Sequence, residues 1–477
     1  MNVRASFLLV LLWLVPAALA TDTTTPSTAS ERAPRADPER LKADVHLSAE
    51  TNAPPASQRR FFKWDFSWQG WDGLHMEVSR RTPLSNPGDR WGPGPLGTNA
   101  FRNIQLDEVK MSGTIGGRLE ADAAAFITTG NLTNFNNDAE IRRALISVRG
   151  DCILVFPVSY LVELGYRANQ FYLNQAYLLS PDLAYVGNLQ LGVFQPPMGL
   201  DLITSSRDIG FLEPAAPLQA IAPPKESGFQ IGHPVFNQRA TWALGIFGDA
   251  ANDTEYGNAS LNYGSAMGRL TWLPVGRLDP DDPAANRFLH LGLSANYQYS
   301  ATSELRYKSR PESYLAPVVI DTGNIDASGA ATIAVEAAWV NGPFSLQGEL
   351  IHSFVQVNNG STLNFGGFYG SASWYLTGES RPYDPATGSF NRLIPRRNFN
   401  FGKAGAWGAV ELAGRFSHTD LTDGSVQGGR LNILMAGVNW YLNPHLRWMF
   451  DCGMGRVSGG PLDGHMLIFQ TRIGVDF

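Results

Sequence analysis

The chain ends in the stretch LIFQTRIGVDF, residues 467–477, in which apolar and polar side chains alternate. One face is apolar except at Thr471 and ends on the aromatic Phe477. The other face carries Gln470, Arg472, Gly474 and Asp476. A period of two is typical of a β-strand, and this division favours a strand with lipid on one side and water on the other. A half-buried closing strand of a soluble β-protein would show the same pattern.

The N-terminus has the pattern of a secretory signal peptide over residues 1–20. Arg4 precedes an apolar run at 7–15, and Ala18-Leu19-Ala20 is a small-x-small cleavage site, so we expect cleavage after Ala20. The alternative is a retained anchor helix, which needs roughly 20 apolar residues, and this run is shorter. Since no comparable run follows, we expect strands of a closed barrel to make any membrane crossing.

The composition indicates an exported β-protein but does not distinguish a barrel from a sandwich. The 477 residues include 49 Gly and 30 Pro, and only 17% are charged, as expected for many strands and turns. The mean hydropathy of −0.14 suits a barrel, whose lumen-facing residues offset the lipid-facing ones. The net charge of −6 argues against a nucleic-acid binder. Cys152 and Cys452 are interpreted as unpaired, with a disulfide as the alternative.

After the signal peptide, the chain divides into a short lead and one large domain. Residues 21–60 are rich in Thr, Ser, Pro, Ala and charge and have no aromatic residue, so we expect a flexible periplasmic lead. Dense aromatic residues begin at Phe61, and alternating segments recur to the end of the chain. Residues 61–477 are therefore predicted to form a single outer-membrane β-barrel.

The alternating segments can be divided into a lipid face and a lumen face. Residues 114–127 place an apolar series opposite Arg118, Glu120 and Asp122. Tyr and Trp gather near segment ends, as in the interfacial girdles of membrane barrels, and bacterial outer-membrane barrels carry a terminal Phe. The number of segments, together with the preference of bacterial barrels for an even count, predicts an all-β transmembrane antiparallel barrel of about 16 strands.

Two connections between the strands differ in kind. Residues 441–445 read as a short turn of the periplasmic type. Residues 195–234 hold seven prolines and Lys225, the only lysine between Lys110 and Lys308. Because proline cannot donate to a strand ladder and a loop of this length is usually functional, we expect this loop to fold inward and narrow the lumen.

Several motifs spread over residues 113–477 resemble the phosphate-selective porin O and P family. They are GRL at 117–119, EIRRA at 140–144, TSSR at 204–207, GPFSLQGE at 342–349, GGFYG at 366–370, ASWYLTGESRPY at 372–383 and NWYLNP at 439–444. The resemblance implies a 16-stranded porin of the bacterial outer membrane, usually trimeric. Such a porin passes inorganic anions, phosphate among them, down their gradient through a constriction lined by basic side chains.

The resemblance places the basic constriction at Arg142 and Arg143, with Lys225 and Arg207 on the long loop. Arginine suits this role because its planar fork matches phosphate oxygens, and several weak sites let the ion leave again. Strand parity allows only one of the adjacent arginines to face the lumen fully, unless a bulge turns both inward. Further arginines would line the wall: Arg118, Arg167, Arg239, Arg269, Arg415 and Arg447.

The predicted lumen face also carries acids, so its charges are about balanced. These acids are Glu120, Asp122, Glu163, Glu336, Glu349, Glu411 and Asp451. Balanced walls often form cross-strand salt bridges that brace a barrel. Each wall arginine therefore has two interpretations, an ion contact or a structural brace. A general or weakly cation-selective porin is the alternative to an anion-selective one.

Two other classes of protein are weighed against a porin. A barrel enzyme, such as an outer-membrane phospholipase or protease, would need an activated nucleophile or an acid pair. The sequence has no Gly-x-Ser-x-Gly, and the adjacent pairs Ser417-His418 and His352-Ser353 point to opposite faces. A soluble β-sandwich would not need aromatic girdles or a terminal Phe. No cofactor or metal is expected, and outer-membrane lipid is the expected surrounding.

Overall fold

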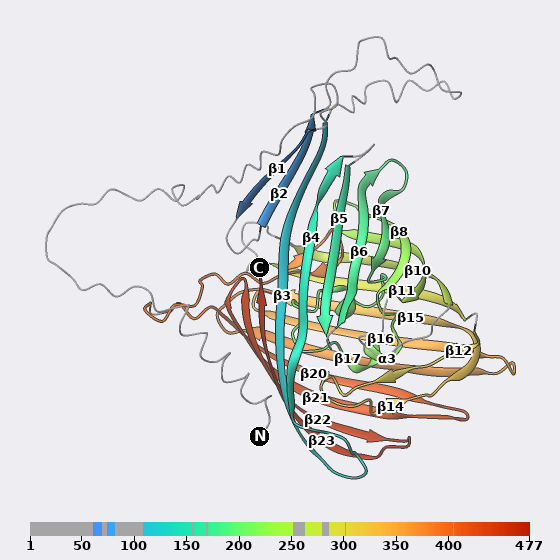
Figure 1. The fold of residues 1–477 in the computed structure, drawn as a ribbon. Helices are drawn as coiled ribbons and strands as arrows, with labels where there is room; N and C mark the ends of the chain where they lie inside the picture. The colour runs from blue at the N-terminus through green and yellow to red at the C-terminus, as the bar shows by residue number, and fades with distance from the viewer. Residues whose placement is uncertain are drawn as a thin grey trace, which may run out of the picture. The chain divides into compact units, whose positions relative to one another are not determined.

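The computed structural model describes residues 61–68, 74–81, 108–153, 157–167, 170–250, 263–278, 286–300, 302–403 and 405–477. The predicted signal peptide and lead, residues 1–60, lie outside them and stay predictions. Sixteen strands close into one antiparallel β-barrel, as the alternation predicts (Figure 1). In the described part of the chain, no helix is both long enough and apolar enough to span a membrane.

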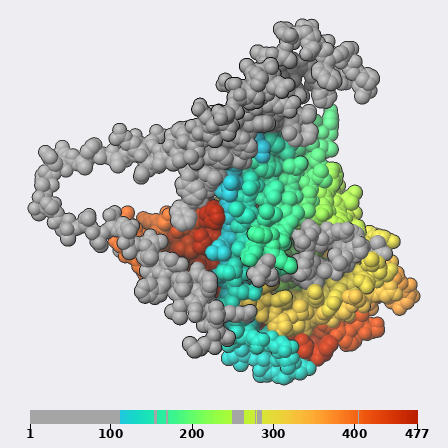
Figure 2. Space-filling view, in the orientation of Figure 1, coloured from blue at the N-terminus to red at the C-terminus, as the bar shows by residue number. Residues whose placement is uncertain are grey.

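The barrel strands follow one another around the wall in chain order. They are β3 (Glu108–Thr128), β4 (Asp138–Ile153), β5 (Pro157–Arg167), β6 (Gln170–Leu183), β7 (Gly187–Phe194), β8 (Glu226–Val235), β9 (Ala240–Ala250), β10 (Tyr263–Arg277), β11 (Arg287–Ser300), β15 (Ile325–Asn341), β16 (Phe344–Val357), β17 (Thr362–Tyr375), β20 (Ala409–Asp423), β21 (Val426–Asn443), β22 (Leu446–Ser458) and β23 (Gly464–Asp476). The wall closes where β23 pairs with β3, from Met466 opposite Thr128 to Asp476 opposite Arg118. In Figure 2 the red surface of the last residues lies beside the cyan surface of β3.

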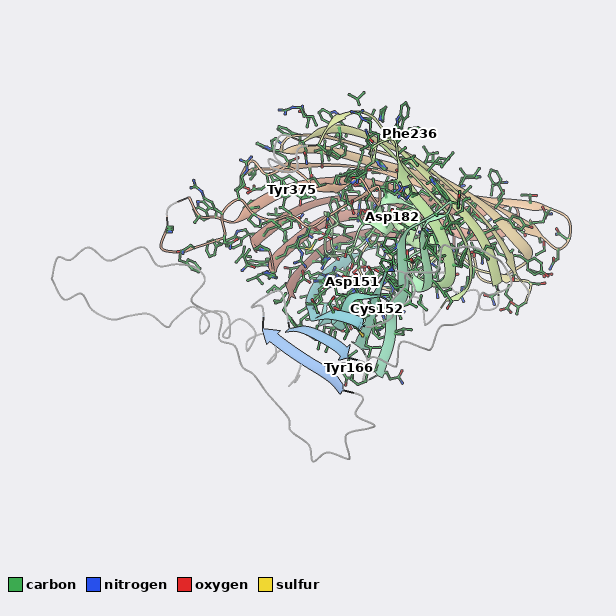
Figure 3. The ribbon with its side chains drawn as sticks, turned by 90° about the horizontal axis from the view of Figure 1, so that it is seen from above. Asp151, Cys152, Tyr166, Asp182, Phe236 and Tyr375 are labelled. Atoms are coloured by element: carbon green, nitrogen blue, oxygen red, sulfur yellow. The ribbon has the colours of Figure 1, made fainter. Side chains whose placement is uncertain are left out.

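Alternation along the strands separates an outer apolar face from an inner polar one. On β23 the outward Leu467 is 40% exposed, whereas the inward Arg472 is 2% exposed. Figure 3 shows side chains on both sides of the strands. The predicted short turn joins β21 to β22 at Asn443 and Leu446, and Cys152 and Cys452 are free, as the sequence indicates.

A two-stranded hairpin extends the wall past the rim at which β23 ends, which we call the C-terminal rim. β1 (Phe61–Trp68) pairs with β2 (Leu74–Arg81), and β2 pairs with β3 from Glu108 to Ile115. Since β23 pairs with β3 only from Arg118 onward, the hairpin occupies the edge that β23 leaves unpaired. Figure 1 shows β1 and β2 beside the start of β3.

The long connection after β7 folds into the lumen, and we call residues 195–225 the inward loop. It contains α2 (Leu200–Ile203) and α3 (Ala216–Ile221) and ends where β8 begins at Glu226. The predicted end of this loop at Pro234 was wrong, because residues 226–232 pair with β7. Pro234 is tolerated because it lies near the end of β8, beyond the residues that pair with β7, where fewer backbone N–H groups are needed for the strand ladder.

Two further connections contribute to the same interior. One carries β12 (Glu304–Leu305), β13 (Lys308–Ser309) and β14 (Ile320–Asp321); the other carries β18 (Tyr383–Asp384) and β19 (Ser389–Phe390). Apolar residues of the inward loop and of the first connection form one core with the wall, among them Met198, Leu218, Tyr307, Val319 and Ile433. Much of the barrel interior is therefore packed protein, and any ion path is confined to what remains.

Candidate functional site in the barrel lumen

The inward loop is held across the lumen by packing and by hydrogen bonds to the wall. Its apolar residues Met198, Leu200 and Leu218 are at most 1% exposed. Its two helices are too short to be stable alone, because helix formation has a costly nucleus. The position of the loop therefore depends on contacts with other parts of the chain.

Buried carboxylates accept hydrogen bonds from backbone N–H groups of the loop. Glu349 of β16 accepts from the N–H groups of Leu200 at 2.7 Å and Asp201 at 2.8 Å. Asp451 of β22 accepts from Leu212 N–H at 2.9 Å. These acids satisfy donors that would otherwise be buried without a partner, which is costly.

Wall arginines satisfy the carbonyl groups of the same loop. Arg447 of β22 donates to the carbonyl oxygens of Arg207 and Ile209, each at 2.8 Å. Arg472 of β23 donates to the Leu212 carbonyl at 2.6 Å. Part of the positive charge on the wall therefore anchors the loop.

Arg142 and Arg143, the predicted constriction pair, both face the lumen. Arg143 of β4 lies opposite Glu120 of β3, and Ile141 lies opposite Ala121, so Arg142 is the extra residue of a β-bulge. The bulge turns both side chains inward, which strand parity alone would not allow. Their side chains are only 1% and 4% exposed, respectively.

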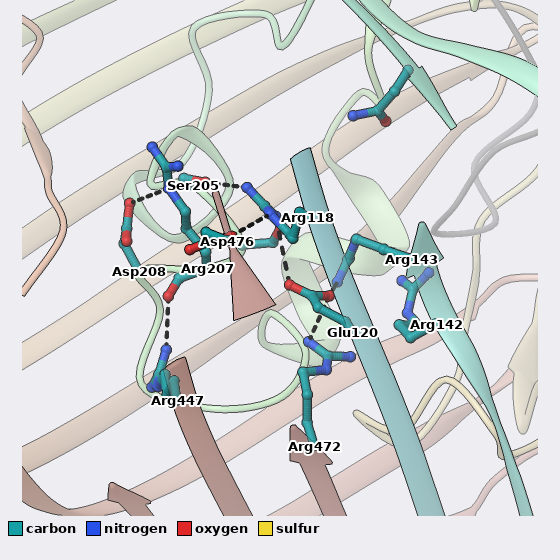
Figure 4. Close-up of polar contacts among 12 residues, drawn as sticks. Arg118, Glu120, Arg142, Arg143, Ser205, Arg207, Asp208, Arg447, Arg472 and Asp476 are labelled. Carbon is teal, nitrogen blue, oxygen red and sulfur yellow. Dashed lines mark hydrogen bonds and ion pairs between the residues drawn. The ribbon is translucent and has the colours of Figure 1, made fainter. Parts of the chain in front are cut away.

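Both arginines are bound to carboxylates in this structure, and Figure 4 shows the contact of Arg143 with Glu120. Arg142 Nε donates to Oε1 of Glu213 in the inward loop at 2.9 Å, and Arg142 Nη2 donates to Oε2 at 3.2 Å. Arg143 Nη1 donates to Oε2 of Glu120 at 2.6 Å. These contacts neutralise the two charges and tie β3, β4 and the loop together.

Arg472 links the same cluster to β23. Its guanidinium donates to both oxygens of Asp122 at 2.7 Å and to Glu213 Oε1 at 2.7 Å. Burial alone would raise the pKa of Glu213, but the charges of Arg142, Arg472 and Arg143 outweigh it and lower that pKa to about 2. Glu213 is thus held ionised as the centre of a buried ion-pair cluster.

Two of the predicted wall arginines have similar buried partners. Arg269 of β10 donates from Nε to Oε1 of Glu336 at 3.0 Å and from Nη2 to the Gly388 carbonyl at 2.8 Å. Arg415 of β20 donates from Nε to Oε2 of Glu312 at 3.0 Å. Both arginines brace connections that fold into the lumen.

Of the other predicted wall arginines, Arg118 and Arg167 lie in the lumen, whereas the predicted wall position of Arg239 was wrong. Arg118 Nη1 donates to the Ser206 hydroxyl at 2.9 Å and also lies near Glu120 and Asp476. Arg167, at the end of β5, donates to the Tyr314 hydroxyl at 3.1 Å. Arg239 lies in the turn before β9 and is exposed.

The two predicted loop cations lie at different places: Arg207 is between α2 and α3, and Lys225 is at the end of the inward loop. Arg207 is 31% exposed on its side chain, and its Nε lies 3.4 Å from the Asp208 carboxylate. Lys225 is partly buried and donates from Nζ to Oδ1 of Asn174 at 2.7 Å. The structure therefore does not bring all four predicted constriction residues to one ring.

An open cavity of about 630 Å³ lies between the inward loop and strands β3 to β6. Arg118 and Arg207 line it, together with two arginines that the sequence reasoning missed, Arg149 and Arg392. We call this space the basic cavity. Three acids also line it: Asp151, Glu163 and Asp476.

Arg149 is the most open cation of the basic cavity. It lies on β4, opposite the inward Thr114 of β3, and its side chain is exposed within the lumen. Among the described residues, no ion pair links it to a carboxylate. Strand parity counted from Arg143 would have identified it as inward-facing.

Arg392 adds charge from the connection after β17. Its side chain is 27% exposed, and its Nη2 lies 3.0 Å from Asp476 Oδ2. Burial and the positive charge of the nearby Arg207 lower the pKa of Arg392. The charges of Asp476 and Asp208 act in the opposite direction. No sequence pattern pointed to this residue.

A second cavity, of about 350 Å³, lies against strands β6 to β9 and is lined mainly by uncharged residues, both polar and apolar; we call it the neutral cavity. Gln175, Tyr177 and Leu179 of β6 line both cavities. The free space of the lumen therefore has a basic part and a neutral part that share one stretch of wall. Within the described ranges, no group of three or more His, Cys, Asp or Glu side chains is placed to hold a metal ion.

Comparison with known proteins decides the class of this barrel. A model of the phosphate-selective porin O and P family matches residues 114–458. The chain belongs to this family. The barrel is therefore an outer-membrane porin, a channel rather than an enzyme, and the predicted family and location are confirmed.

Individual relatives of this porin are distant. Porin O of Pseudomonas aeruginosa is 25% identical over 385 residues, covering 72% of this chain and 83% of its own. An uncharacterised protein of Caulobacter vibrioides is 25% identical over 421 residues, covering 83% and 78%. Among solved structures, an anion-selective porin from Comamonas acidovorans has a TM-score of 0.46 at 11% identity, covering 77% of this chain and 100% of that one.

Proposed function

We propose that small anions, phosphate among them, cross this porin by passive diffusion through the basic cavity. The observation that carries the proposal is the division of the lumen arginines into two groups. One group binds carboxylates or loop carbonyls and serves as braces, and all of its members are buried except the half-buried Arg447: Arg142, Arg143, Arg269, Arg415, Arg447 and Arg472. The other group lies open to the cavity or at its edge: Arg118, Arg149, Arg207 and Arg392.

The open group suits conduction because none of its guanidinium groups is fully enclosed by tightly bound protein groups. A hydrated anion can exchange water for guanidinium N–H donors one arginine at a time. Lys225 donates to Asn174, which in turn donates to Glu163 in the lining of the basic cavity, so Lys225 supplies a cation near this cavity. Several moderate sites favour passage, because an ion that binds too strongly does not leave.

A weakly selective porin is the second candidate function. Asp151, Glu163 and Asp476 line the same cavity and reduce its net positive charge. If these acids dominate, small cations would pass as well. The ratio of anion to cation permeability in a planar bilayer tests the two candidates directly.

We also propose that the porin assembles as a homotrimer through the outer face of β3. This face carries Gly117 and, after Leu119, three alanines in succession: Ala121, Ala123 and Ala125. Small side chains allow neighbouring barrels to approach closely. Crosslinking of the purified porin in detergent tests this proposal, with a three-chain band as the expected result and a single-chain band as the contrary one.

A further inference from the structure

The neutral cavity has a chemistry that anion conduction does not explain. Its wall carries five side-chain amides, contributed by β6, β7, β8 and the inward loop: Gln175, Asn188, Gln190, Gln195 and Gln230. Its volume of about 350 Å³ is within the range of small-molecule pockets, about 300–1,000 Å³. It lies beside the second half of β8, at Gln230, Gly232 and His233, and the start of β9, at Thr241.

Two of these amides are free to bind a solute. Gln190 of β7 lies directly opposite Gln230 of β8, so both side chains face the cavity. Among the described residues, neither side-chain amide makes a hydrogen bond, and Oε1 of Gln230 is buried without any partner. A buried polar atom of this kind is rare in proteins and indicates that water or a ligand supplies the missing bond.

The cavity offers little net charge to an ion. Its arginine, Arg269, donates to Glu336 and to the carbonyl of Gly388, and its side chain is only 4% exposed. Its histidine, His233, lies at the edge with Nδ1 3.7 Å from Asp182 Oδ1. An anion would therefore gain less here than beside Arg149 in the basic cavity.

An aromatic cluster completes the lining. Tyr177 meets Phe194 edge to face, with ring centroids 6.2 Å apart, and Phe194 meets Phe247 in the same way at 5.5 Å. Tyr177 and Phe194 line the cavity. Thr387 and Ser389, from the connection after β17, add hydroxyl groups on the facing side.

We propose that this cavity binds neutral polyhydroxylated solutes of the size of a monosaccharide or a linear polyol. Each amide of Gln190 and Gln230 offers one acceptor and two donors, which match neighbouring hydroxyl groups. The half-buried ring of Tyr177, packed against the buried Phe194, takes the C–H face of such a solute, and the absence of free charge costs a neutral molecule nothing. The porin thus has a second solute site beside the anion path.

The test measures the chloride current of the purified full-length porin in a planar bilayer while sorbitol or glucose is added. A solution of a polymer too large to enter the pore, matched in viscosity to the sorbitol or glucose solution, gives the reference current expected without binding. We expect sorbitol and glucose to lower the current in a saturable way beyond that reference. The double variant Gln190→Leu, Gln230→Leu should raise the half-blocking concentration about tenfold, because two amides lose their bonds.

Matched variants make the outcome decisive. Gln427→Leu changes an exposed amide at the opposite rim and should leave the block unchanged. If the double variant does not form the heat-modifiable barrel, a second set of variants replaces it. Thr387→Val and Ser389→Ala each remove a hydroxyl group on the other side of the cavity and should weaken the block. A current that follows viscosity alone, or an equal block in all variants, overturns the proposal. The reversal potential in a salt gradient is read in the same membranes, so failure of anion selectivity is recognised separately.

Discussion

Arg142 holds Glu213 through two hydrogen bonds, Nε to Oε1 at 2.9 Å and Nη2 to Oε2 at 3.2 Å. The first residue is the bulged residue of β4, and the second belongs to the inward loop. The pair therefore joins the wall to the segment that fills the lumen. Its position explains why a basic residue at a predicted constriction serves as a brace in this fold.

The Arg142 and Glu213 pair is expected to be strongly coupled in stability. Arg142→Met or Glu213→Leu alone should each lower the free energy of unfolding by about 3–5 kcal/mol, because each leaves a buried charge without one of its partners. The double variant should lose less than the sum of the two. Urea unfolding of the porin in detergent micelles measures all four proteins. Additive losses would show that the pair does not act as a unit.

Acid pH is expected to loosen the inward loop through Glu213. The pKa of Glu213 lies at about 2, below its ordinary 4.5, so its carboxylate stabilises the docked loop above pH 4.5. That contribution is lost as pH falls from about 4.5 toward about 2. Single-channel recordings across this window should show growing current fluctuations. Glu213→Gln should show fluctuations already at neutral pH and a flatter pH profile; identical profiles in the two proteins would contradict this account.

Arg149 is expected to control selectivity without affecting stability. Arg149→Ala should lower the ratio of anion to cation permeability about two- to threefold, the effect of one charge several ångströms from the ion path in water. Arg456→Ala is the matched control, because Arg456 is an exposed arginine paired with Asp463 outside the basic cavity. Reversal potentials under a salt gradient provide the measurement. An equal effect of the two substitutions would assign selectivity to overall charge.

Arg269 is expected to behave in the opposite way. Its guanidinium is buried against Glu336, so Arg269→Met should lower the thermal stability of the barrel, read from the temperature of the gel-mobility shift. The permeability ratio should stay close to that of the unaltered porin. A large loss of anion selectivity with unchanged stability would show that this arginine contacts ions.

Lys225 is expected to act through its charge near the basic cavity. Lys225→Gln keeps a donor for Asn174 but removes the charge, so phosphate should block the chloride current a few-fold less well. Lys225→Arg should retain the block. Phosphate titration of the chloride current compares the three proteins, and equal block in all of them would remove Lys225 from the ion path.

The alternation of residues such as those in 467–477 was enough to predict the barrel and its strand number. It places each side chain on the lipid or the lumen side, and no other pattern of the chain competes with it. The sequence predicted the end of the inward loop too far along the chain, because prolines recur through residues 195–234. In the structure, residues 226–232 already pair as strand. Proline content marks connections but does not locate the first strand residue after them.

The division of the arginines into braces and open cations could not be predicted from the sequence. Arg142 and Glu213 are separated by 71 positions, and Arg472 and Asp122 by 350. Such pairs depend on the register of strands and on the path of the inward loop, which local patterns do not contain. The bulge at Arg142 likewise has no marker in the EIRRA segment, whereas the inward face of Arg149 was available from parity.

The central claim is that open arginines of the basic cavity make this porin anion-selective. The most direct measurement is the reversal potential of the purified porin in a planar bilayer under a salt gradient, followed by phosphate titration of the chloride current. The account predicts anion selectivity, a phosphate block, and loss of both when Arg149 and Arg207 are replaced together by alanine. A reversal potential near zero or of cationic sign would contradict it, because the acids Asp151, Glu163 and Asp476 would then dominate the cavity.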